Sequence, residues 1–78
     1  MLDYLNEAFE ISNQLLAQGH KQEAEEVNLV VSSASTGTEI VMGLRKVFSM
    51  LLRSGIPIDD LTKARISKAI DGLDELLR

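Results

Sequence analysis

The chain of 78 residues contains no cysteine and no tryptophan, and it has one proline and one histidine. The absence of cysteine excludes disulfide bonds and thiolate metal sites, and it is compatible with a reducing compartment. Only three residues are aromatic, namely Tyr4, Phe9 and Phe48, so the core must be aliphatic. No segment has the pattern of a targeting signal or a membrane span, which predicts a soluble cytoplasmic protein.

The composition indicates a packed fold. Hydrophobic residues make up 45% of the chain, with few glycines, which argues against disorder. We expect a single helical domain over residues 1–78, close to the smallest size at which a chain folds without disulfides or metals.

Hydrophobic periodicity and turn residues divide the chain into four predicted helices, at residues 3–18, 21–33, 39–53 and 60–77. Asp3 and Asp59 are suited to cap the first and fourth helices, because a carboxylate can accept the free amide hydrogens of a first turn. Gly19 is suited to end the first helix in a left-handed conformation. These signals predict an all-α fold, a compact four-helix bundle made of two antiparallel hairpins.

The helix at residues 39–53 is predicted to be central. Between residues 40 and 52 its polar side chains are only Arg45, Lys46 and Ser49, so neighbours must cover most of its surface. Thr36 and Glu39 fit a capping box that starts this helix near residue 37 or 38.

An internal glycine and two methionines of the same helix predict close packing. Gly43 costs about 1 kcal/mol relative to alanine inside a helix, so we expect another helix backbone to approach it closely. Met42 and Met50 are expected to fill the core.

The other helices have apolar stripes that predict their core positions. In the first helix the stripe is Leu2, Leu5, Phe9 and Leu16, widened by Tyr4, Ala8, Ile11 and Leu15. In the second helix it is Ala24, Val27, Val31 and Ala34, broadened by Leu29 and Val30, and in the fourth it is Leu61, Ile66, Ile70, Leu73 and Leu77.

The sequence shows no constellation for catalysis or cofactor binding. His20 is the only histidine, lies in a predicted surface turn and cannot anchor a zinc site alone. The carboxylates lie off the apolar stripes. Helical spacing places no nucleophile, general base and orienting residue next to one another, as a catalytic site would require. The glycine-containing loop at residues 35–38 lacks the pattern of a phosphate-binding loop. We therefore expect no enzyme activity, no metal and no other cofactor.

The net charge of −4 is unevenly distributed. Residues 1–39 carry seven acidic side chains and one lysine, a net charge of −6, whereas residues 40–78 carry seven basic and five acidic side chains, a net charge of +2. Either the halves neutralise each other across the bundle, or the acidic half faces a basic partner. The acidic balance argues against direct nucleic-acid binding.

Two groups of acidic side chains are candidates for contact with a protein partner. Acids in the first turns of the second helix are favoured by the helix dipole, whereas acids near the end of the fourth helix oppose it, which makes the latter group the better candidate. The candidate residues are Glu23, Glu25, Glu26, Glu39, Asp71, Asp74 and Glu75.

Three stretches of the C-terminal half carry a resemblance: residues 35–45 (STGTEIVMGLR), 58–61 (IDDL) and 69–77 (AIDGLDELL). They resemble small helical immunity proteins of bacterial contact-dependent growth inhibition and related polymorphic toxin systems. The resemblance implies a cytoplasmic protein that binds a cognate toxin domain, often a ribonuclease, and blocks its active site. The alternative is a homodimeric adaptor or a regulatory module, whose third helix is covered by a second copy or by a partner helix.

Overall fold

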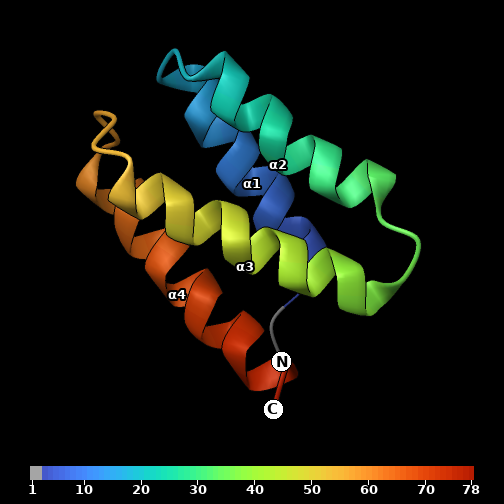
Figure 1. Ribbon diagram of the computed structural model, residues 1–78. Coiled ribbons are helices and arrows are strands. Elements are labelled where there is room, and N and C mark those ends of the chain that lie inside the picture. Colours follow the sequence, from blue (N-terminus) through green and yellow to red (C-terminus); the bar gives the residue numbers. More distant parts are fainter. Residues whose placement is uncertain (1–2) are drawn as a thin grey trace.

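The computed structural model describes residues 3–78 and contains four helices: α1 (Tyr4–Ala17), α2 (Lys21–Ser33), α3 (Gly37–Arg53) and α4 (Asp60–Leu76) (Figure 1). No strand is present in these residues. The predicted all-α four-helix bundle is therefore confirmed, and the predicted bounds agree to within two residues at each helix end.

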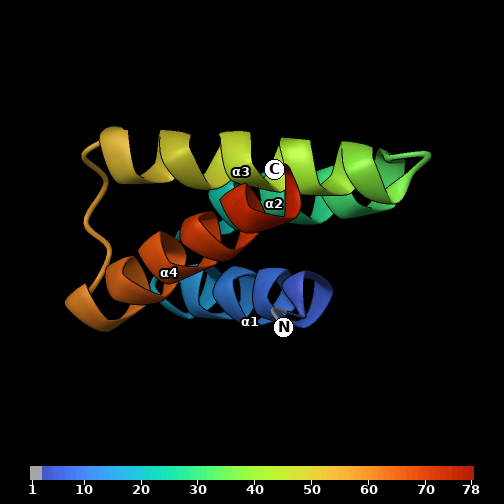
Figure 2. The same cartoon turned by 90° about the horizontal axis from the view of Figure 1, so that it is seen from below.

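The helices form a ring in which each packs mainly on two others. Consecutive helices pack on one another, and α1 also packs on α4, so the two hairpins lie against each other. Figure 2 shows α1 and α3 on opposite sides of the molecule, with α4 running obliquely between them. Within residues 3–78, no helix combines the length and the apolar character needed to cross a membrane.

Side-chain caps fix where the helices begin. The Thr36 hydroxyl accepts a hydrogen bond from the backbone N–H of Glu39 (3.2 Å), and the Glu39 carboxylate accepts one from the N–H of Ser35 (3.1 Å). This reciprocal arrangement starts α3 at Gly37, as the capping box predicted. Asp59 likewise caps α4 by accepting from the N–H three residues on, at 2.8 Å.

Asp3 and Gly19 mark the two ends of α1 as predicted. The Asp3 carboxylate accepts from the N–H of Asn6 at 3.1 Å. Gly19 has a φ of +86°, a conformation in which a Cβ atom would be strained. The chain therefore reverses directly into α2.

An aliphatic core holds the four helices together. Phe48 of α3 is its largest fully buried side chain, and α3 contributes four buried hydrophobic residues, whereas α1 and α4 contribute three each. This contribution agrees with the predicted central role of the third helix. The buried hydrophobic residues are Ala8, Ile11, Leu15, Ala24, Val27, Val41, Leu44, Phe48, Leu51, Ile58, Ile66, Ala69 and Leu73.

The core-facing side of α1 differs from the predicted stripe. Leu5, Phe9 and Leu16 are 46%, 62% and 54% exposed, whereas the buried side consists of Ala8, Ile11, Ser12 and Leu15. Leu2 lies outside the described residues. The apolar surface of α1 is wider than its two neighbours cover, and periodicity cannot choose between adjacent apolar stripes.

On α4 a threonine takes an inner position that the sequence assigned to a leucine. Leu61 is 82% exposed, whereas Thr62 is buried and its hydroxyl accepts a hydrogen bond from the Gln18 side chain (3.0 Å). Because this bond satisfies the hydroxyl, its burial carries little cost. Leu77, also predicted in the core, is 40% exposed just beyond the last helical residue.

Gly43 lies directly against a side chain of α2. A Cβ atom added to Gly43 would lie 2.6 Å from the Cγ1 methyl of Val30. The close approach predicted for this glycine is present, but the approaching atoms belong to a side chain rather than to a helix backbone.

The two methionines of α3 do not fill the core. Met42 and Met50 are 57% and 49% exposed. They stay at the surface because α3 packs mainly against α2 and α4, so part of its circumference remains uncovered.

Hydrogen bonds tie the turn between α1 and α2 to the connector between α3 and α4. The Gln18 side chain accepts from the N–H of Asp59 (2.9 Å), and the His20 ring lies with Nε2 2.8 Å from the carbonyl of Pro57. A carbonyl only accepts, so Nε2 carries the hydrogen. His20 is therefore a half-buried structural contact rather than a free surface residue.

The contact between Gly43 and Val30 predicts opposing effects of one substitution. Gly43→Ala should lower the free energy of unfolding by about 1 kcal/mol, because crowding against a β-branched side chain outweighs the gain in helix propensity. In a Val30→Ala background the same substitution should stabilise by about 1 kcal/mol, since only propensity remains. Urea unfolding of the four variants measures both values. A stabilising effect of Gly43→Ala in the presence of Val30 would contradict the contact.

Candidate interaction surface

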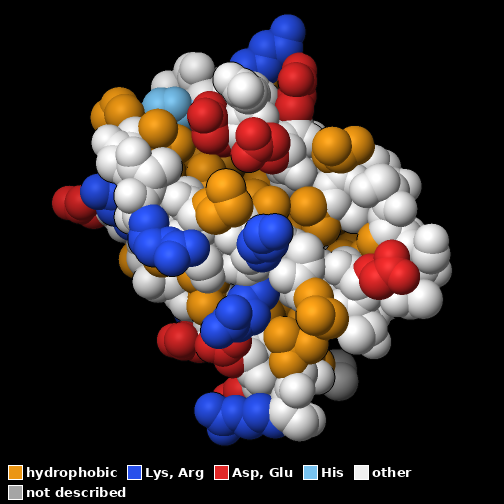
Figure 3. All heavy atoms as spheres, viewed as in Figure 1, with side chains coloured by type: hydrophobic (Ala, Val, Ile, Leu, Met, Phe, Trp, Pro, Cys, Tyr) orange, Lys and Arg blue, Asp and Glu red, His pale blue; other side chains and the backbone are white. Residues whose placement is uncertain are grey.

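The acidic candidates of α2 lie at the surface near the start of the helix. Glu25 and Glu26 are exposed and Glu23 is half-buried. Figure 3 shows acidic side chains gathered over the first part of α2. Within residues 3–78, none of the three carboxylates is in an ion pair or a side-chain hydrogen bond.

Two of the other candidates already have partners in the fold. Glu39 caps α3 through Ser35, and Asp74 of α4 forms an ion pair with Arg45 of α3. Asp71 and Glu75 are exposed, and neither is in an ion pair within the described part of the chain. The structure therefore keeps the α2 and α4 groups apart, and it gives part of the α4 group a structural role.

A single ion pair connects the acidic and basic halves of the chain among residues 3–78. The Arg65 guanidinium donates from Nε to Glu7 Oε2 (3.0 Å) and from Nη2 to Glu7 Oε1 (3.1 Å), which joins α4 to α1. These hydrogen bonds hold the pKa of Glu7 below its usual value, although partial burial acts in the opposite direction. Neutralisation between the halves is partial, and the acids of α2 are in no ion pair within residues 3–78.

An apolar groove of about 330 Å³ runs between α2 and α3 beside these acids. Its lining residues are Glu26, Leu29, Val30, Gly43, Lys46, Val47 and Met50. Leu29 and Met50 are 63% and 49% exposed. Hydrophobic side chains are visible between α2 and α3 in Figure 3.

The sequence did not reveal this groove. Periodicity assigned Leu29, Val30 and Met50 to the core, because all three extend apolar stripes. Gly43 was the only sequence signal for unusual packing at this position, because a glycine inside a helix indicates that a neighbouring group approaches it closely.

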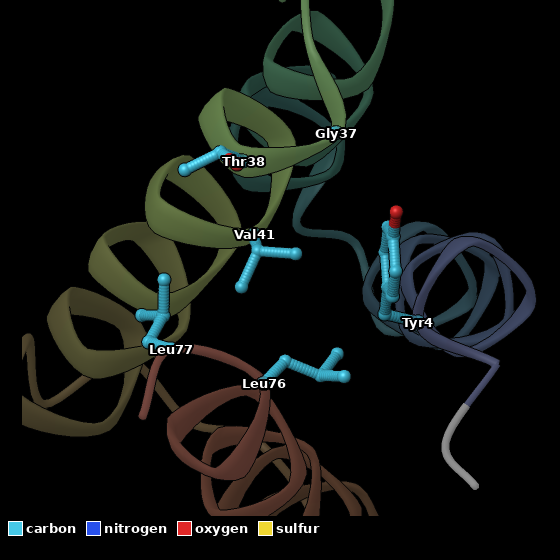
Figure 4. A pocket seen from close by; sticks show the side chains of 6 residues that line it. All are labelled: Tyr4, Gly37, Thr38, Val41, Leu76 and Leu77. Atoms are coloured by element: carbon cyan, nitrogen blue, oxygen red, sulfur yellow. The ribbon is translucent and has the colours of Figure 1, made fainter.

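A second hollow, of about 320 Å³, lies where α1 and α3 begin and α4 ends. Figure 4 shows the Tyr4 ring forming one wall and Val41 and Leu76 pointing into the space. Its lining residues are Tyr4, Gly37, Thr38, Val41, Leu76 and Leu77. Among the described residues no charged side chain lines this hollow, so they offer mainly apolar contact.

The described residues provide no arrangement for metal binding. Among residues 3–78, no three His, Cys, Asp or Glu side chains lie close enough together to hold a metal ion. The surface instead offers exposed carboxylates and exposed apolar side chains, which are kinds of group that occur in protein interfaces.

Comparison of the chain with protein-family models, with curated proteins and with solved structures gives no match. The resemblance of the C-terminal half to immunity proteins therefore stays a prediction.

The ion pair between Glu7 and Arg65 predicts acid sensitivity. Because the pKa of Glu7 is lower in the folded protein than in the unfolded chain, the unfolded chain binds the proton more readily. The stabilisation is complete above the carboxyl range and disappears as the pH falls through it. At pH 7, Glu7→Gln should lower the melting temperature by roughly 4–8 °C, corresponding to about 1 kcal/mol for a partly exposed bidentate pair.

Thermal melts monitored by circular dichroism test this dependence. The deficit of Glu7→Gln should shrink towards zero near pH 2, where the wild type has also lost the ion pair. Glu25→Gln is the matched control, because Glu25 has the same charge but no ion pair. A deficit that persists unchanged at low pH would contradict the ionic origin of the stabilisation.

Proposed function

We propose that this protein is an immunity protein that binds a cognate toxin domain in the cytoplasm and covers its active site. The observation that carries the proposal is the group of α2 carboxylates, Glu23, Glu25 and Glu26, which have no ionic partner within residues 3–78. The surplus of negative charge predicted for the N-terminal half is thus available to another molecule.

A nuclease is the class of toxin that this surface suits best. A nuclease presents cations to the phosphates of its substrate, and carboxylates can occupy the same cations through charge-assisted hydrogen bonds. Complementary charge also accelerates the encounter of two proteins. An acidic inhibitor can therefore reach the active site quickly and exclude the nucleic acid from it.

The α2 group is a stronger contact candidate than the α4 group. Asp74 is already paired with Arg45, and Lys68 and Arg78 lie within one helical turn of Asp71 and Glu75 in the sequence, whereas the three acids of α2 have one such neighbour, Lys21. Charge at the end of α4 is therefore mixed. Glu39 lies in the first turn of α3, where its carboxylate already takes part in capping the helix. Any contact that it makes with a toxin is therefore additional to this structural role.

The direct test is copurification of the tagged protein with the product of the adjacent upstream gene, followed by a growth-protection assay. We expect a complex, and we expect cells that express the toxin domain to survive only when this protein is also produced. Absence of both the complex and the protection would contradict the proposal.

Charge reversal locates the contact. The double variant Glu23→Lys/Glu25→Lys should weaken toxin binding at least tenfold, about 1.4 kcal/mol, because like charges then face the cations of the toxin. Isothermal titration calorimetry measures the affinity, and far-ultraviolet circular dichroism verifies that the helices are intact.

The control variant Asp71→Lys/Glu75→Lys changes the net charge by the same amount on α4. It should weaken binding less than the α2 variant does. A larger loss in the control would move the contact to α4. Unchanged affinity in both variants would exclude an acidic contact surface.

A further inference from the structure

Three large apolar side chains, Leu5, Phe9 and Leu16, form an exposed stripe on α1. Each of them is about half exposed or more. They lie at i, i+4 and i+11, which places them on one side of a helix with 3.6 residues per turn. Figure 2 shows α1 at the edge of the bundle, with no helix on its outer side. The exposed α1 stripe is therefore open to another molecule.

The contact of α1 with α4 lies on the other side of the helix. Glu7, which pairs with Arg65 of α4, is two residues away from both Leu5 and Phe9. Two residues correspond to about 200° of rotation around a helix. The ion pair to α4 and the exposed α1 stripe consequently lie on opposite sides of α1.

The exposed α1 stripe has no charged neighbours on its own helix. On a helix surface, a residue is next to those three and four positions away. At these positions around the three stripe residues the sequence has no Asp, Glu, Lys or Arg, whereas exposed Leu29 and Met50 have Glu26 and Lys46 at this spacing. Two copies of this protein, each with a net charge of −4, can therefore meet along the stripe without placing like charges in contact.

The spacing of the stripe matches its own reversal. Leu5 and Leu16 are eleven residues apart, so the midpoint between them lies between residues 10 and 11, close to Phe9. If two such helices run in opposite directions about a two-fold axis at this midpoint, Leu5 of each copy lies level with Leu16 of the other. The two Phe9 side chains then lie side by side at the axis, about 4.5 Å apart along the helix direction.

The reversed copy also supplies the bulky side chain that the stripe lacks between Phe9 and Leu16. The residues there are Ser12 and Asn13, and the hydroxyl of buried Ser12 donates to the carbonyl of Ala24 on α2 (3.4 Å). When helices pair side by side, a side chain of one packs between four residues of the other, spaced at i, i+3, i+4 and i+7. Phe9, Ser12, Asn13 and Leu16 have this spacing, and their centre is about level with Phe9 of the second copy.

We propose that α1 pairs with α1 of a second copy in an antiparallel, two-fold symmetric dimer. An isologous interface uses the same surface of both copies, and the reversed spacing of the stripe makes this surface complementary to itself. Three side chains from each copy make a small contact, so the dimer is weak and depends on protein concentration. The stripe contains none of the acidic candidates for toxin binding, so the test of the dimer is independent of the proposed function.

Sedimentation equilibrium over a range of concentrations tests the dimer. We expect the average mass of the wild type to rise from 8.6 kDa towards twice that value. Phe9→Asp should raise the dissociation constant at least tenfold, because the two introduced carboxylates would lie next to each other at the axis. Leu29→Asp is the matched control: Leu29 is as exposed as Phe9 but lines the groove between α2 and α3, so this variant should dimerise as the wild type does.

Engineered disulfides test the antiparallel arrangement, since the chain has no cysteine of its own. When Leu5→Cys and Leu16→Cys are mixed and oxidised in air, the two thiols lie level with each other in the mixed dimer. In a dimer of either variant alone they are about 16.5 Å apart along the helix direction, which is too far for a disulfide. We expect the mixture to form the covalent dimer at least ten times faster than either variant alone, as measured by non-reducing denaturing electrophoresis.

Circular dichroism verifies that every variant is folded, and three outcomes would overturn the proposal. The first is a wild-type protein that stays monomeric at every concentration. The second is a dimer that Leu29→Asp weakens as much as Phe9→Asp does, which would place the interface at the groove between α2 and α3. The third is a Leu5→Cys variant that forms the covalent dimer alone as fast as in the mixture, which would exclude the antiparallel pairing.

Discussion

Burial of one aliphatic core is the constraint on which every helix of this protein depends. Helices of 13–17 residues are marginal in isolation, and no disulfide can support them. The buried side of α3, with Leu44 and Phe48, supplies the largest share of this core. All four helices nevertheless leave large apolar side chains exposed, among them Phe9, Leu29 and Leu61.

The parts of the fold governed by local chemistry could be predicted from the sequence. Caps such as Thr36 and Asp59 act over three or four residues, so the helix bounds followed from neighbouring residue types. Which side of a helix is buried depends on distant residues. Thr62 takes an inner position because Gln18 satisfies its hydroxyl, a contact that spans 44 residues of sequence and leaves no local signal. The inward side of α1 was likewise set by its neighbours.

The candidate surface was predictable in its charges but not in its shape. Carboxylates off the apolar stripes were expected at the surface, and those of α2 lie there. The groove beside them could not be predicted. Leucine and methionine are typical core residues, so the residue types of Leu29 and Met50 do not indicate that these side chains are exposed. Glu26 belongs to both the acidic group and the groove.

The order of contacts in the bundle has a consequence for how the protein forms. Each helix packs on the next one in the chain, and within residues 3–78 the main packing between helices distant in the sequence is that of α1 on α4. Domains rich in such local contacts fold in microseconds to milliseconds. The chain therefore spends little time unfolded, so its aliphatic segments are accessible to aggregation only briefly.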